Sequence, residues 1–85
     1  MLNHKPNRDR KEIYAETLKA CVEPKLKTQL MYQTNVSYSS LLRTVRQLRS
    51  FGLLVFEKGT RKYATTCKGK EYIKKWMALQ ELLQA

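Results

Sequence analysis

Small hydroxyl and basic side chains share one side of a helix that we predict over residues 37–51. This polar side carries Ser39, Ser40, Arg43, Arg46, Gln47 and Ser50. Arginine and glutamine side chains hydrogen-bond the edges of DNA bases, and arginine and serine bind phosphate oxygens. The chain has no Asp or Glu between Glu23 and Glu57, whereas solvent-facing helices usually pair glutamate with lysine. The pattern therefore favours a face that binds duplex DNA over an ordinary basic surface.

The residues around this helix indicate where it begins and ends. Ser37 is a suitable N-cap, because its hydroxyl can accept a hydrogen bond from a free amide of the first turn. Gly52 follows the last turn, where a left-handed backbone conformation favours glycine. At about 100° per residue, the other side of the helix is apolar and consists of Leu41, Thr44, Val45, Leu48 and Phe51. We expect this side to pack on a core.

A shorter segment before this helix completes a helix-turn-helix pattern. We predict a second helix over 25–32, with a start as late as Lys27-Thr28, and with Leu26, Leu30 and Met31 facing inward. A polar turn over 33–35 and the apolar Val36 follow. In a helix-turn-helix the later helix lies in the major groove and the earlier one braces it. Candidates for contact with the DNA backbone are Lys25, Lys27, Thr28, Ser37, Tyr38, Ser39 and Ser40, and candidates for base edges are Arg43, Arg46 and Gln47.

Two short β-prone runs, 53–56 and 62–66, flank a basic turn that contains Gly59. They predict a hairpin, although alternation alone does not decide whether Leu53 and Val55 or Leu54 and Phe56 face inward. A hairpin directly after a reading helix is a wing. Its basic residues Lys58, Arg61 and Lys62 would meet phosphates or the minor groove.

The two ends of the chain are predicted to support this unit. Residues 1–8 form a basic arm, and a first helix begins after Asn7 or Asp9 and runs to about Val22. Its apolar stripe consists of Ile13, Tyr14, Leu18, Cys21 and Val22. A last helix, capped by Thr66, follows over 67–85, and its apolar seam, Tyr72, Trp76, Leu79 and Leu83, has the spacing of coiled-coil positions. We predict that this seam is the interface of a homodimer, with residues 9–66 as the DNA-binding domain.

The composition limits the classes of function. The chain has 85 residues and a net charge of +10, so we expect one small domain that attracts polyanions. An anionic membrane is the competing partner, but no apolar run has the length of a membrane span and no signal peptide follows Met1. We therefore expect a cytoplasmic, nucleoid-associated protein.

Catalytic chemistry has little support in the sequence. Cys21 and Cys67 are too far apart for a zinc-binding pair, and His4 is the one histidine. We expect free thiols, with a disulfide as the minority alternative in a reduced compartment. The sequence shows no nucleophile–base pair or phosphate-binding loop, so we predict no enzyme, no metal, no cofactor and no small-molecule ligand.

Four segments of the chain resemble a known family. They are RDRKEIYAETL (8–18), KTQLMYQTNVSYSSL (27–41), LRSFGLL (48–54) and KYATTCKGKEYI (62–73). They are similar to the small archaeal winged-helix DNA-binding proteins, which include ten-kilodalton crenarchaeal chromatin proteins and predicted archaeal transcriptional regulators. The resemblance implies a mainly α (α+β) winged helix-turn-helix fold with three helices, a two-stranded wing and a C-terminal dimerisation helix.

The same resemblance implies binding of double-stranded DNA as a homodimer. A transcriptional regulator is the leading interpretation. A chromatin-type architectural binder with little sequence specificity is one alternative, and a winged helix that binds only proteins is another.

Overall fold

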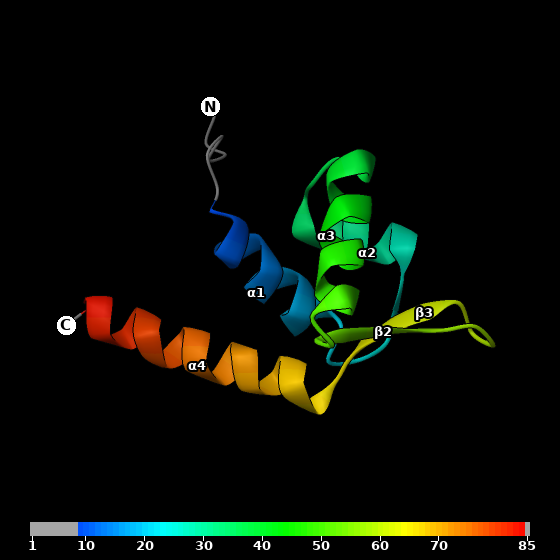
Figure 1. Cartoon of the computed structure of the whole chain (residues 1–85). Helices are drawn as coiled ribbons and strands as arrows, with labels where there is room; N and C mark the ends of the chain where they lie inside the picture. The colour runs from blue at the N-terminus through cyan, green and yellow to red at the C-terminus, as the bar shows by residue number, and fades with distance from the viewer. Residues whose placement is uncertain (1–8, 85) are drawn as a thin grey trace.

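The structure is a computed structural model that describes residues 9–84. Its elements are α1 (Arg10–Ala20), β1 (Lys25–Leu26), α2 (Lys27–Thr34), α3 (Tyr38–Ser50), β2 (Leu54–Glu57), β3 (Lys62–Thr65) and α4 (Cys67–Gln84). The four helices pack beside a small antiparallel sheet with strand order β1-β3-β2, and the β2–β3 hairpin projects beyond them (Figure 1). This confirms the predicted mainly helical winged helix-turn-helix fold. The predicted arm, residues 1–8, lies outside the described residues.

The core lies where α1, α2 and α3 meet the inner face of the hairpin. Its fully buried side chains include Leu18, Leu30, Leu41, Leu48 and Leu54. The predicted apolar side of α3 supplies two of these leucines, and Val36 packs against the cluster from the turn before α3. Within β2, Leu54 and Phe56 face inward and Val55 is exposed, whereas Leu53, which precedes the strand, is buried as well.

Strand β1 was not predicted, whereas the start of α2 at Lys27 agrees with the later of the two predicted starts. Lys25 and Leu26 pair with Tyr63 and Lys62 of β3, so α2 begins only at Lys27. The side chain of Gln29 accepts a hydrogen bond from the Leu26 amide at this start. The predicted polar turn is also shorter, because α2 continues to Thr34, whose hydroxyl donates to the carbonyl oxygen of Leu30 at 2.7 Å.

Three side chains that we predicted to face inward are exposed instead. Val22, Leu26 and Phe51 are 48%, 38% and 51% exposed. Val22 lies beyond the end of α1, which stops at Ala20, so the helical stripe does not extend to it. Leu26 belongs to a strand and not to a helix. Phe51 follows the last turn of α3, and its ring meets the Tyr14 ring edge-on.

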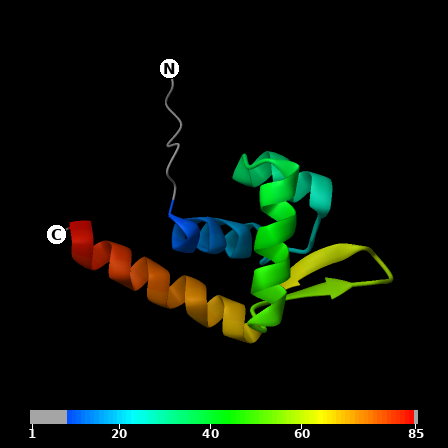
Figure 2. The same ribbon diagram turned by 45° about the horizontal axis from the view of Figure 1, so that its top comes forward.

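Helix α4 starts against the segment that joins α3 to β2 and packs along α1 before its C-terminal end leaves the body of the molecule. The Thr66 hydroxyl accepts from the Gly69 amide at 3.0 Å and donates to the carbonyl oxygen of Gly52 at 2.7 Å, which confirms Thr66 as the cap. Tyr72 and Ile73 pack against the core. The C-terminal half of α4 extends past the other elements (Figures 1 and 2).

Candidate nucleic-acid interface

Helix α3 is held at both ends by the predicted residues. The Ser37 hydroxyl accepts from the Ser40 amide at 3.2 Å, so Ser37 is the N-cap. Gly52 has a φ of +77°, in the left-handed region that favours glycine. Between these ends Leu41, Val45 and Leu48 are buried. The outward side of α3 is therefore fixed relative to the core.

Arg43 and Arg46 lie on that outward side and are exposed, together with Ser39 and Ser50. Within residues 9–84 neither arginine forms an ion pair. Both guanidinium groups keep their hydrogen-bond donors available, and an arginine carries five of them. A helix that carries small serines and positively charged arginines on one side can fit into the major groove of DNA.

Gln47 lies at the margin of this outward side, where its side chain is hydrogen-bonded to α1. Its side-chain oxygen accepts hydrogen bonds from the Tyr14 hydroxyl at 2.5 Å and from Nη1 of Arg10 at 3.1 Å. The structure therefore places Gln47 at the edge that α3 shares with α1. Arg10 reaches the same edge, although sequence reasoning assigned the first helix to scaffold and did not select it.

A second arginine that sequence reasoning missed lies on the wing side of α3. The Arg49 guanidinium lies 5.7 Å from the centre of the Phe56 ring, within the range of a cation–π contact. Arg46, Arg49 and Ser50 line a shallow hollow with Val55 of the wing. Arg49 follows Arg46 by three residues, and this helical spacing is the feature of the sequence that could have identified it.

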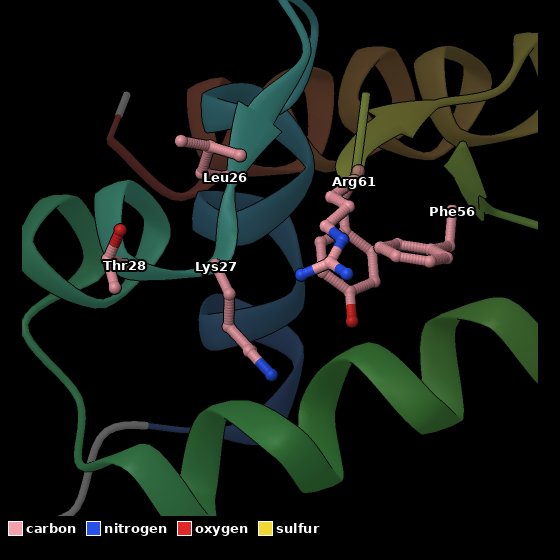
Figure 3. A pocket seen from close by; sticks show the side chains of 6 residues that line it. Leu26, Lys27, Thr28, Phe56 and Arg61 are labelled. Atoms are coloured by element: carbon pink, nitrogen blue, oxygen red, sulfur yellow. The ribbon is translucent and has the colours of Figure 1, made fainter. Parts of the chain in front are cut away.

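The start of α2 and the base of the wing form one hollow of about 500 Å³. It is lined by Leu26, Lys27, Thr28, Phe56, Arg61 and Tyr63. Lys27 and Arg61 extend into it from either side, above α3 (Figure 3). The sequence predicted phosphate contacts from the start of α2 and from the wing independently, and the structure brings Lys27 and Arg61 to one place. The Lys27 ammonium also lies 5.3 Å from the Tyr38 ring centre.

The other cations that were predicted before α2 and on the wing, Lys25, Lys58 and Lys62, do not line this hollow. The Lys25 ammonium bonds the carbonyl oxygen of Glu23 at 3.2 Å and lies 3.9 Å from the Glu23 carboxylate. Lys58 is exposed in the turn of the hairpin, and Lys62 is half-buried in β3. Arg61, which does line the hollow, closes the turn with a φ of +61°, and its amide donates to the carbonyl oxygen of Glu57.

The predicted dimer seam divides into two parts. The Tyr72 hydroxyl donates to the carbonyl oxygen of Lys11, and its ring meets Tyr14 edge-on, so Tyr72 packs within its own chain. Burial raises the pKa of Tyr72, with smaller contributions from Tyr14 and Asp9. Trp76 is half-buried, whereas Leu79 and Leu83 are exposed.

Residues 9–84 offer neither a metal site nor a membrane span. No group of three His, Cys, Asp or Glu side chains is placed to hold a metal ion there. No helix in that range is long and apolar enough to cross a membrane. Cys21 is buried and Cys67 is exposed, and both are free thiols.

Comparison with known proteins supports the same fold. The family described as winged helix-turn-helix matches residues 7–84, which is nearly the whole chain. No curated protein matches the chain.

Proposed function

The chain belongs to the winged helix-turn-helix family, and we propose that it is a dimeric DNA-binding protein that regulates transcription. Membership of this family suggests DNA binding, since such domains are typically binding modules and not enzymes. The observation that carries the proposal is the outward side of α3, where Arg43 and Arg46 are exposed and unpaired within the described residues. We place this side of α3 in the major groove.

The charge of the chain supports a phosphate-binding surface around that helix. A protein with a net charge of +10 releases counterions when its cations neutralise DNA phosphates, which favours association at low salt. The hollow between Lys27 and Arg61 would receive the strand that passes between α3 and the wing. Thr28 can donate its hydroxyl to the same phosphates, and Lys58 can reach the next ones along the backbone.

We propose that two copies associate through the exposed part of α4. Leu79 is 51% exposed, and Leu82 and Leu83 are each 75% exposed. A run of large apolar side chains at the free end of a helix is costly in water and is a common sign of an interface. A symmetric dimer would present two α3 helices to half-sites about one helical turn apart, or a multiple of that spacing.

A titration of a fluorescent random-sequence duplex with the full chain tests the proposal. We expect binding that weakens steeply as salt rises, with a slope of about −0.9 in log–log form for each phosphate contact. In Arg43→Ala/Arg46→Ala, binding should weaken by about 1–3 kcal/mol for each arginine that reads a base edge in the wild type. No duplex binding by the wild-type chain at moderate salt would refute the proposal and favour a protein-binding module.

A matched variant separates the role of α3 from the effect of total charge. Lys70→Ala/Lys74→Ala also removes two positive charges, but from exposed positions one turn apart on α4. We expect it to bind nearly as tightly as the wild type, because screening limits the effect of distant charges. An equal decrease of affinity in the two double variants would show that α3 is not the reading helix. Equal affinity for every sequence would favour the architectural alternative over a regulator.

A further inference from the structure

Helix α1 fixes the orientation of the Gln47 amide on α3. The side-chain oxygen of Gln47 lies 3.1 Å from Nη1 of Arg10. A guanidinium group has donors and no acceptor, so the amide atom that faces Arg10 must be the oxygen. The Tyr14 hydroxyl donates to the same oxygen. The amide nitrogen and its two donors are left on the side away from α1.

Tyr14 is itself held firmly enough to maintain this orientation. It is 9% exposed, and its ring lies between two others in edge-on contacts. The centres of the Phe51 and Tyr72 rings are 6.3 Å and 6.5 Å away. The packed rings therefore hold the Tyr14 hydroxyl in place beside Gln47. Rotation of the Gln47 amide would break two hydrogen bonds and place its donors against those of Arg10.

The outward side of α3 consequently offers donors from every long side chain. Arg43 and Arg46 carry donors only, and the oxygen of Gln47 is already occupied. The remaining acceptors there are short serine hydroxyls, and the Ser50 hydroxyl donates to the backbone carbonyl of Gln47 at 2.7 Å. In the major groove guanine presents two adjacent acceptors, O6 and N7, whereas adenine presents N7 beside a donor.

We infer that the protein selects base pairs with acceptor edges, guanine above all, and that Arg10 and Tyr14 are positioning residues that prevent Gln47 from reading adenine. Glutamine normally recognises adenine with its oxygen and nitrogen together, and here the oxygen is not free. This inference rests on the proposed function, because it concerns the sequence preference of the same DNA-binding face.

Selection from a duplex pool with a randomised central region tests the inference on the full chain. The wild type should enrich guanine at the positions that face α3. Arg10→Ala/Tyr14→Phe frees the Gln47 oxygen and keeps the ring of Tyr14. At one base pair it should raise the adenine-to-guanine ratio by about tenfold, the scale of one bidentate contact. The fraction of the duplex pool that the protein retains measures DNA binding, and the enrichment of particular bases among the retained duplexes tests the inference.

Two substitutions of Gln47 itself keep the test decisive if the double variant does not fold, as judged by circular dichroism. Gln47→Lys supplies donors only and should keep the preference for guanine. In Gln47→Ala, the frequency of adenine among the selected duplexes should not fall at any position. An adenine preference in the wild type that Gln47→Ala removes would overturn the inference, as would an unchanged profile in a folded double variant. A pool that the wild type retains without enrichment would also overturn it, while leaving DNA binding intact.

Discussion

Gly69 on α4 lies directly against the backbone of Leu53, in the segment that joins α3 to β2. A β-carbon added at Gly69 would lie well inside van der Waals contact of the Leu53 carbonyl oxygen, and 2.5 Å from Cγ2 of Thr65. Leu53 is also tied to both neighbouring helices, because its amide donates to Leu48 and its carbonyl oxygen accepts from Thr66. The absence of a side chain at Gly69 therefore sets how closely α4 approaches the segment that joins α3 to β2.

Gly69→Ala should destabilise the protein by about 1–3 kcal/mol, the usual cost of overpacking. In an open helix the same change would stabilise by about 1 kcal/mol, because alanine favours helix. The clash should outweigh this gain, since the contact is with backbone. Urea unfolding followed by circular dichroism measures the difference.

Gly59→Ala is the matched control for that measurement. A β-carbon at Gly59 would meet nothing within 4 Å, so stability should change little or increase by about 0.4–1 kcal/mol. If both variants lowered the free energy of unfolding equally, close packing at Gly69 would not be the cause.

The ends of α3, its buried side and the start of α4 follow from local sequence. Ser37 and Gly52 determine the ends of α3, and the apolar spacing between them determines its buried side. Thr66 likewise signals the start of α4. Each of these features depends on residues within a few positions of one another, which is why one sequence suffices to predict them.

The parts that could not be predicted depend on contacts between distant residues. Strand β1 has two residues and exists because it pairs with β3, almost forty positions later. That pairing also brings Lys27 beside Arg61. The orientation of Gln47 depends on Tyr14 and Arg10, which belong to another helix. A helical projection places Gln47 on the polar side of α3 but cannot show which neighbour occupies its oxygen.

Arg61→Gly should separate stability from DNA binding. Arg61 has a φ of +61°, and a non-glycine residue in this conformation costs about 1–2 kcal/mol. Glycine removes that strain, and its own loss of chain entropy offsets part of the gain. We expect the free energy of unfolding to rise by about 1 kcal/mol or less, the difference between these two effects, while affinity for duplex DNA falls.

Lys58→Gly provides the comparison within the same turn. It removes one positive charge from a residue whose φ is not positive. Affinity should fall in the same direction as in Arg61→Gly, but thermal stability should not rise. Thermal melts and salt-dependent duplex titrations of the two variants give both quantities. A lower melting temperature for Arg61→Gly would contradict the strain argument.

The Cys21 thiol should make stability depend on pH above neutrality. Burial raises the pKa of Cys21 from its ordinary value of 9.0 to about 12, and Lys25 opposes this shift. Between these values the unfolded chain releases the thiol proton while the folded chain retains it. The free energy of unfolding should therefore fall as pH rises from about 9 to about 12.

Variants at the two cysteines isolate this contribution from other groups that titrate in the same range. The fall in stability should be smaller in Cys21→Ala, because the buried thiol is gone. It should persist in Cys67→Ala, since Cys67 is exposed. Denaturant unfolding of the three proteins across that pH range measures the difference, and parallel pH profiles would exclude Cys21 as the source.

Leu79→Glu/Leu83→Glu should convert the proposed dimer to monomers. Both leucines are exposed on the free half of α4, so the substitution should leave the fold of the single chain intact. In a dimer it would bury like charges without partners, which costs several kcal/mol. Sedimentation velocity over a range of concentrations should show a dimer for the wild type and a monomer for the variant.

The same substitution should weaken duplex binding, because a monomer presents one α3 and lacks the gain from two linked sites. Lys70→Ala/Lys74→Ala lowers the net charge by the same two units at exposed positions elsewhere on α4. It should remain dimeric, which separates the effect of the apolar seam from that of a lower net charge. A wild-type chain that sediments as a monomer at every concentration would rule out the dimer. Loss of dimerisation with unchanged affinity would show that each subunit binds DNA alone.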